Sequence, residues 1–395
     1  MFAFGMVSDL LHQVHTYKSS TSNESLISMA FYRCQADRKK LSNTLTSYSQ
    51  LLLLCNFFIS VAFVVSLQAQ GENISYPKPA GLVWEASLDT AKSYRTVVAS
   101  LLEAYEEETG VNLSPGSRGK MGIKINARGG PGLSTPLILL QSVIEAFERR
   151  GFERRSILIM DYSTYGLREA NILPSLGGSD GDFEGCPVYA LDSEHYYDKA
   201  WYYDSPLPPS RNQAVKAIDK GGYQDSFLLE KDDARKSFLP MPLLFDVDFW
   251  VNLAVGVDDK SLGIDGALAN ATLWNVSNGQ RFLRSDATAA VAIAEIAAIP
   301  ELNERMLLHF VSLERYQYIG GPKFNSLYTH SEPLLWMSSD PVAMDKLLFD
   351  RINGLRRNNG FPEIDPLPQQ LPFAASLGLG VFDESLVVIE RITKR

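Results

Sequence analysis

A glycine-rich turn between two predicted elements carries residues that are suited to bind an anion. Residues 124–135 read KINARGGPGLST, so a strand ending in Lys-x-Asn meets an arginine, three glycines and a Ser-Thr pair that can cap a helix. Free N–H groups and the dipole at a helix start favour anions, and arginine can bind phosphate or carboxylate with two hydrogen bonds. The turn predicts an anion site, although its glycines could serve geometry alone. The candidate ligand-binding residues here are Lys124, Asn126, Arg128, Gly130, Ser134 and Thr135.

A carboxylate follows the next predicted strand. Asp161 ends the apolar run 156–161, and ligands of open parallel sheets lie at the carboxyl ends of strands. We therefore expect Asp161 to share an edge with Asn126 and Arg128, where it would act as a base or hold a metal. The alternative is that Asp161 caps the helix that follows it.

Three more carboxylates are close together in a later segment. Asp258, Asp259 and Asp265 lie within eight residues, and Asn270 follows as a further candidate ligand-binding residue. Oxygen ligands of this kind suit a hard divalent cation. The alternative is a solvated acidic loop, because charged clusters are usually exposed.

The remaining titratable candidates are histidines and one cysteine. His330 lies in a predicted loop and is the histidine best placed to titrate functionally, so Asp161, Asp258 and His330 form the candidate catalytic set. His309 lies in an apolar pattern and is expected to pack in the core. Cys186 has no activating base near it in sequence and is expected to be a buried thiol.

The elements that would position these residues indicate an α/β fold. A strand over 121–126, a helix over 136–149 and a strand over 156–161 form a strand–helix–strand unit, for which a parallel crossover is expected. We predict a mainly parallel sheet flanked by helices, with an irregular insertion around 163–238. Further predicted strands cover 243–257, 333–338 and 385–391, and further predicted helices cover 90–108, 263–274, 286–299, 302–313 and 341–352, the last capped by Asp340.

The first 69 residues are expected to lie outside this fold. The apolar run 51–67 follows basic residues and precedes small ones, which is the layout of an export signal, with Ala69 as the cleavage position. The alternatives are an uncleaved membrane anchor and a buried core helix. Residues 71–119 are predicted to be a lead-in with a first helix, and residues 120–395 a single α/β domain. We therefore expect an exported protein of the periplasm or cell envelope.

Composition excludes several classes of protein. Hydrophobic residues make up 45% and charged residues 21% of the 395 residues, which excludes a wholly disordered chain. The net charge of −9 argues against a general nucleic-acid binder. Cys34, Cys55 and Cys186 are too few to hold an ordinary iron–sulfur cluster, which needs about four cysteine ligands.

The order of three segments resembles the family catalogued as domain of unknown function 362. The first reads GIKINARGGPGLSTP over 122–136, the second GIDGALAN over 263–270, and the third SDPVAMD over 339–345. The resemblance implies an α/β fold with a cleft shared by these segments. It also implies an association with iron–sulfur modules, so a redox protein or another envelope protein is a possible partner. The family's usual Lys-x-His and Ala-Leu-Lys-Asn read VDDK at 257–260 and ALAN at 267–270 here.

Two classes of function follow from these residues. The first is an enzyme that acts on a small anion, with a divalent cation as its possible cofactor and a rate set by a carboxylate or by His330. The second is a non-catalytic binding or assembly protein of the envelope, for which the tyrosine-rich stretch 189–203 could be an interaction surface.

Overall fold

The structure is a computed structural model, and it describes residues 76–88, 94–205, 236–283 and 285–392. By internal contacts the chain divides into two units, 1–71 and 72–395. The predicted export segment, its cleavage position at Ala69, and Cys34 and Cys55 lie outside the described residues, so export stays a prediction. Among the described residues, no helix is both long and apolar enough to cross a membrane.

A nine-stranded sheet organises the second unit. Its pairs β8–β11, β2–β8, β2–β3 and β3–β5 are parallel, and β14 and β4 run antiparallel to their neighbours. The predicted α/β fold with a mainly parallel sheet is thereby confirmed. In spatial order the strands are β15 (Val388–Ile392), β1 (Leu82–Ser87), β14 (Leu334–Ser338), β11 (Met306–Ser312), β8 (Phe249–Ala254), β2 (Met121–Ile125), β3 (Ile157–Asp161), β5 (Cys186–Ala190) and β4 (Asp180–Phe183).

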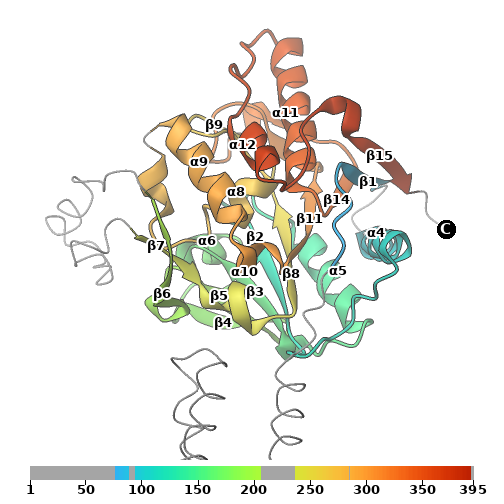
Figure 1. The fold of residues 1–395 in the computed structure, drawn as a ribbon, viewed down its shortest axis with the longest axis vertical. Coiled ribbons are helices and arrows are strands. Elements are labelled where there is room, and N and C mark those ends of the chain that lie inside the picture. The colour runs from blue at the N-terminus through green and yellow to red at the C-terminus, as the bar shows by residue number, and fades with distance from the viewer. Residues whose placement is uncertain (1–75, 89–93, 206–235, 284, 393–395) are drawn as a thin grey trace, which may run out of the picture. The chain divides into compact units, whose positions relative to one another are not determined.

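Helices cover both faces of this sheet (Figure 1). On one face α4 and α5 pack on alternate residues of the central strands, such as Val251 and Leu253 of β8. On the other face α8 and α9 pack near Trp250, and α11 covers Val311 and Trp336. The alternation follows from strand geometry, in which successive side chains point to opposite faces. The helices are α4 (Tyr94–Thr109), α5 (Leu137–Glu148), α6 (Thr164–Glu169), α8 (Ala267–Ala271), α9 (Asp286–Ala297), α10 (Pro300–Asn303), α11 (Pro341–Asn358) and α12 (Gln370–Ser376).

Two smaller sheets complete the described elements. A four-stranded sheet in the order β10-β9-β12-β13 carries the acidic segment and the predicted loop of His330. A two-stranded sheet of β6 and β7 belongs to the irregular insertion around 163–238, of which residues 206–235 lie outside the described part. The bounds are β6 (Tyr197–Asp204), β7 (Lys236–Pro240), β9 (Val257–Asp259), β10 (Gly263–Asp265), β12 (Tyr316–Gln317) and β13 (Thr329–His330).

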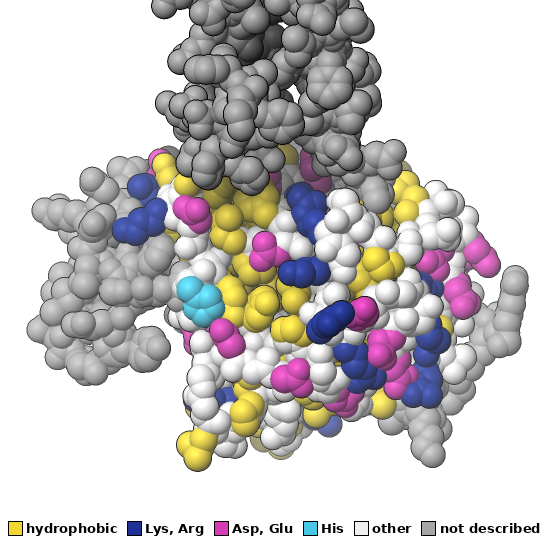
Figure 2. Space-filling view, turned by 90° about the horizontal axis from the view of Figure 1, so that it is seen from below, with side chains coloured by type: hydrophobic (Ala, Val, Ile, Leu, Met, Phe, Trp, Pro, Cys, Tyr) yellow, Lys and Arg dark blue, Asp and Glu magenta, His cyan; other side chains and the backbone are white. Residues whose placement is uncertain are grey.

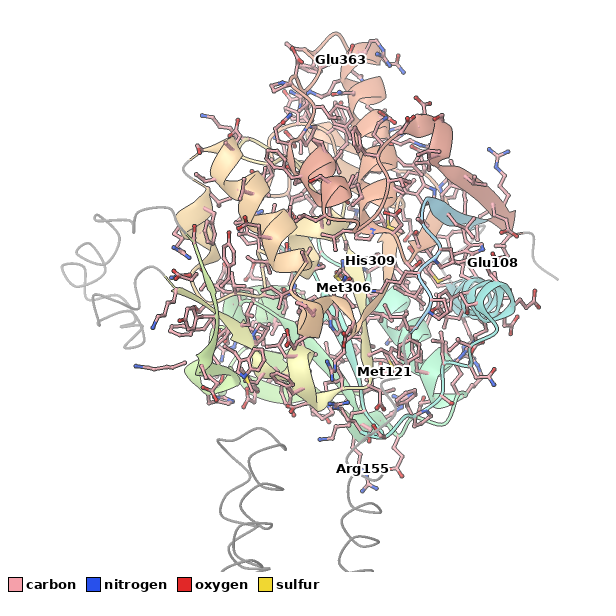
Figure 3. The ribbon with its side chains drawn as sticks, in the orientation of Figure 1. Glu108, Met121, Arg155, Met306, His309 and Glu363 are labelled. Carbon is pink, nitrogen blue, oxygen red and sulfur yellow. The ribbon has the colours of Figure 1, made fainter. Side chains whose placement is uncertain are left out.

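One described face of the molecule shows acidic and basic side chains interspersed among hydrophobic ones (Figure 2). In the interior, His309 and Met306 lie within the ribbon, whereas the charged residues Arg155 and Glu363 lie at its periphery (Figure 3). Cys186 is buried on β5, and burial raises the pKa of its thiol to about 12, as expected for an inert thiol.

Four sequence predictions need correction. The predicted helix 302–313 is mostly the central strand β11, because a strand buried on both faces is apolar throughout and imitates a buried helix. The predicted helix 263–274 is the strand β10 followed by the short helix α8. The predicted strand 243–257 begins with a π-helical turn, and β8 starts only at Phe249. The lead-in before residue 94 contains β1, a strand within the main sheet.

Asp340 joins three separate parts of the fold. One carboxylate oxygen accepts hydrogen bonds from the amides of Val342 (2.9 Å) and Ala343 (2.8 Å), which confirms the predicted cap of α11. The other oxygen accepts from the amides of Gly81 (2.8 Å), just before β1, and Val381 (3.0 Å). One buried carboxylate therefore ties a helix start to an outer strand and to the C-terminal segment.

Replacing Asp340 tests this joint. Asp340→Ala leaves four amides without their acceptor, so we expect a loss of about 3 kcal/mol or more in the free energy of unfolding. The matched control is Ser285→Ala, which removes the cap of α9 from a single amide and should cost about 1 kcal/mol. Urea unfolding of both variants measures the difference. Equal losses would contradict a joining role for Asp340.

Candidate functional site

A row of polar side chains crosses the middle of the main sheet. Lys124 of β2 lies opposite Asn252 of β8, Asn252 lies opposite His309 of β11, and His309 lies opposite Ser338 of β14. All four side chains are buried. Buried polar groups cost free energy unless they are hydrogen-bonded, so this row must find partners within the protein.

The ammonium of Lys124 finds a complete set of partners. It donates to Asp161 Oδ1 (2.6 Å), to the carbonyl of Ile125 (2.6 Å) and to Asn270 Oδ1 (2.9 Å). Asp161 Oδ2 in turn accepts from the amide of Ala127 (2.9 Å). An ammonium has three donors, and all three are used here.

The network continues from Asn270 toward the middle of the sheet. Asn270 Nδ2 donates to Asn252 Oδ1 (2.7 Å), and Asn252 Nδ2 donates to His309 Nδ1 (3.0 Å) and to the carbonyl of Ala267 (2.8 Å). Burial, assisted by the charge of Lys78, lowers the pKa of His309 to about 3, so its ring is neutral at pH 7. His309 Nε2 is buried and has no hydrogen-bond partner among the described residues.

These contacts correct three predicted roles. Lys124 points to the α8 face of the sheet and is fully buried, so it does not present its charge to a ligand. Asp161 pairs with Lys124 rather than capping α6, whose cap is Ser163, or standing free as a base. Asn270 belongs to the core network.

The short helix α8 is held in place by a second buried carboxylate. Asp345 of α11 accepts hydrogen bonds from the amides of Ala267 (2.6 Å) and Leu268 (3.0 Å) at the start of α8. A side chain on Gly266 would place its Cβ 2.3 Å from Asp345 Oδ1, so glycine is required for this approach. Burial raises the pKa of Asp345 to about 7, although the two amides oppose the shift.

Arg128 lies beside this core, and one nitrogen of its guanidinium, Nη1, makes all of its hydrogen bonds to described side chains. Nη1 donates to Asp265 Oδ2 (2.5 Å) and Asp259 Oδ2 (3.3 Å), and the guanidinium carbon lies 3.8 Å from the ring centroid of Trp274. Trp274 Nε1 donates to the other oxygen of Asp265 (2.9 Å). Burial raises the pKa of Asp265, and the charge of Arg128 opposes that rise. The arginine is thereby fixed in place and orientation.

The same arginine keeps donors for other partners. Its side chain is 24% exposed, and within the described residues both of its side-chain hydrogen bonds come from Nη1. Nε and Nη2 form the edge of a guanidinium that binds a carboxylate or phosphate with two parallel hydrogen bonds. Asn126 Oδ1 accepts from the amide of Arg128 (3.0 Å), which fixes the start of the turn.

A narrow hollow lies at this place. The space among its side chains is too small for a water-sized sphere. A segment of residues 320–325, which we call the strap, forms one wall: the amide of Phe324 donates to the carbonyl of Gly129 (3.1 Å), and Lys323 Nζ donates to the carbonyl of Arg128 (3.1 Å). The hollow is lined by Asn126, Arg128, Gly129, Leu133, Val255, Val257, Asp265 and Pro322.

The predicted three-aspartate metal site is not formed. Asp259 and Asp265 bind Arg128, whereas Asp258 accepts hydrogen bonds from the amides of Gly320 (3.1 Å) and Gly321 (2.9 Å) in the strap. Within the described ranges no three His, Cys, Asp or Glu side chains come together as a metal site. The guanidinium of Arg128 lies between Asp259 and Asp265, and Asp258 instead binds the strap.

The other predicted residues serve local structure. Thr135 Oγ1 donates to the carbonyl of Leu253 (2.7 Å) and accepts from the amide of Asn126 (2.8 Å), and neither it nor Ser134 caps α5, which begins after Pro136. Gly130 has a φ of 85°, so it serves the turn itself. His330 on β13 packs edge-on against Tyr316, with ring centroids 5.6 Å apart, whereas Asp161 pairs with Lys124 and Asp258 with Arg356.

Sequence reasoning missed several residues of this region. Asn252 and Ser338 lay in predicted strands with no role assigned to them, and Trp274 lay in a predicted helix with no ligand assigned to it. His309 was predicted to pack in the core, which is confirmed, but it does so from β11 rather than from a helix. One available signal was the presence of single polar residues, Asn252 and His309, inside otherwise apolar runs, because such residues need buried partners.

Comparisons with known proteins leave the family open. No family model and no curated protein matches the sequence. A solved structure of a protein from Thermotoga maritima is similar with 11% identity and a TM-score of 0.28, and the match covers 61% of this chain. The match spans about half of that protein, 53% of its length. The resemblance to the domain of unknown function 362 family therefore stays a prediction.

Removal of Lys124 tests the core role of its ammonium. Lys124→Met leaves the carboxylate of Asp161 buried without a counter-charge, so we expect a loss of about 3–5 kcal/mol in the free energy of unfolding. Lys124→Met combined with Asp161→Asn should recover part of that loss, because the second charge is gone. Urea unfolding measures both. A stable single variant that has lost anion binding would instead place Lys124 at the ligand.

The raised pKa of Asp345 predicts a pH dependence of stability. Its pKa is about 7 in the folded protein and about 3.9 in the unfolded chain, so between these values the folded state binds the extra proton. The contribution of Asp345 is fully present below about pH 4 and is lost as the pH rises through about 7, at up to about 1.4 kcal/mol per pH unit. Asp345→Asn should remove this slope. Unfolding midpoints of both proteins from pH 4 to 8 check it, and a pH-independent difference between them would contradict it.

Proposed function

We propose that this chain binds a small anion in the hollow at the strand ends, with Arg128 as its main contact. The observation that carries the proposal is the state of Arg128: one nitrogen is held by two carboxylates, one face lies on Trp274, and the Nε–Nη2 edge has no partner among the described residues. A guanidinium held in this way loses little conformational freedom when an anion binds, which favours affinity.

The surroundings set the charge that the site can accept. Arg128 contributes one positive charge, and Asp259 and Asp265 contribute up to two negative charges at its Nη1. Lys323 adds a positive charge on the strap, close to the carbonyl of Arg128. These charges nearly cancel, so an anion would be held by directed hydrogen bonds rather than by a strong positive field.

Binding requires the strap to move, because the hollow does not hold even a water-sized sphere. The strap contacts the glycine-rich turn through the two hydrogen bonds of Lys323 and Phe324 and through the packing of the Phe324 ring over Gly132. Its two ends are held elsewhere, by hydrogen bonds to Asp258 and Gln317, so the movement is confined to the residues between them. Phe324 is 42% exposed, so part of this residue already faces solvent before the strap moves.

The contacts of the predicted catalytic residues favour binding over turnover. Asp161 is engaged by Lys124, Asp258 by strap amides and Arg356, and His330 packs against Tyr316. None of these three lines the hollow. A general base must lie within hydrogen-bond reach of the proton that it takes. The carboxylate that lines the hollow is Asp265, and both of its oxygens accept hydrogen bonds, from Arg128 and from Trp274. We therefore place non-catalytic binding ahead of an enzyme, within the exported protein that the sequence predicts.

Substitution of Arg128 tests the proposal. A thermal-shift titration with sodium acetate and with inorganic phosphate should give a saturable stabilisation in the unaltered chain with at least one of them, of about 2.7 kcal/mol at 100 times the dissociation constant. Arg128→Ala should abolish it, and Arg128→Lys should retain little because an ammonium cannot donate through a planar fork.

The control is Arg357→Ala, which removes an exposed arginine of α11 paired with Glu363 and should leave the shift intact. Each variant is compared with its own ligand-free melting temperature, because loss of Arg128 also leaves Asp265 without its counter-charge. A shift that persists in Arg128→Ala would contradict the proposed site.

A further inference from the structure

The hollow beside Arg128 has two unlike walls. One is polar and consists of Asn126, Arg128 and Asp265, together with the backbone of Gly129. The other is apolar, and three of its side chains form a small cluster of their own, each at most 4% exposed: Leu133, Val255 and Val257, with Pro322 of the strap beside them. A ligand that fills the hollow must therefore offer a polar end and an apolar body.

The polar wall offers donors. Asn126 is 3% exposed, its Oδ1 is committed to the amide of Arg128, and its Nδ2 donates to no other described residue. Nδ2 and the Nε–Nη2 edge of Arg128 together present donors for at least three hydrogen bonds. Each oxygen of Asp265 already accepts one hydrogen bond, Oδ2 from Arg128 and Oδ1 from Trp274. The wall fits a group that only accepts hydrogen bonds.

The charge balance decides between the common acceptor groups. Arg128 and Lys323 carry two positive charges against the two carboxylates of Asp259 and Asp265, so each negative charge on the ligand is also placed near those two carboxylates. A phosphate near pH 7 carries up to two negative charges, whereas a carboxylate carries one and matches the planar fork of a guanidinium.

We propose that the ligand is a small monocarboxylate with a short unbranched apolar chain, its carboxylate on Arg128 and Asn126 and its chain against Leu133, Val255 and Val257. This inference rests on the proposed anion site and names the class of its ligand. The hollow is narrow, which favours a short chain over a long one.

The test is a calorimetric titration of the full chain with acetate, propionate, butyrate and inorganic phosphate. Affinity should rise about fourfold for each added methylene, the gain expected from burying one CH₂ group, and phosphate should bind more weakly than propionate. Asn126→Asp keeps the acceptor for the amide of Arg128 but replaces the Nδ2 donor by a negative charge. It should lower the affinity for every carboxylate by about tenfold or more.

A second variant addresses the apolar wall. Val257→Thr keeps the approximate size and shape of the side chain but replaces one methyl group by a hydroxyl, so it should leave acetate binding unchanged and flatten the gain with chain length. Circular dichroism confirms that each variant is folded before it is titrated.

The outcomes separate the two proposals. If phosphate binds more tightly than every carboxylate and Arg128→Ala abolishes that binding, the ligand class is overturned and the anion site stands. If carboxylates bind but neither chain length nor Val257→Thr matters, the apolar wall has no part and the inference is overturned. If no probe binds to the folded chain, both the inference and the proposed function fail.

Discussion

The buried ammonium of Lys124 is the constraint on which the middle of this fold depends. A charge in the interior is tolerated only when it is paired and fully hydrogen-bonded, so β2 cannot be placed without Asp161 on β3 and Asn270 on α8. Asn270 then fixes Asn252, whose amide fixes the ring of His309. One charged side chain thus determines the relation of three parallel strands to the short helix that covers them.

That helix also connects the core to the hollow. α8 has only five residues, too few to be stable by itself, and Asp345 at its start supplies acceptors for two of its amides. The chain leaves α8 toward Trp274, which lies on the guanidinium of Arg128 and donates to Asp265. The helix α8 and the residues next to it therefore both hold Arg128 in position and supply a hydrogen-bond partner to Lys124. A substitution at Asp345 that displaces α8 is expected to affect both side chains.

Local patterns in the sequence predicted the parts of this structure that local physics decides. The parallel strand–helix–strand unit of β2, α5 and β3 and the Asp340 cap of α11 were confirmed, whereas the predicted cap of α5 by Ser134 or Thr135 was wrong. β11 was misread because a strand buried on both faces loses the period-two signal. The site was predicted only in part for a different reason. That Arg128 binds Asp265, 137 positions later, and that Lys124 is bonded to Asp161 and Asn270 in the core both depend on strand register, which no local pattern carries.

Lys124 and Arg128 are both basic and lie four residues apart, but one serves the core and the other remains available to a ligand. Lys124 has three donors and three acceptors around it, so its bonding capacity is exhausted within the core. Arg128 has five donors, and its two side-chain hydrogen bonds within the described residues use one nitrogen. Its aspartates and Trp274 hold it still without saturating it. A selective site for a small hydrogen-bond acceptor needs donors of fixed direction next to an apolar wall. The donors of Arg128 that make no hydrogen bond in the core therefore say more about ligand binding than those that do.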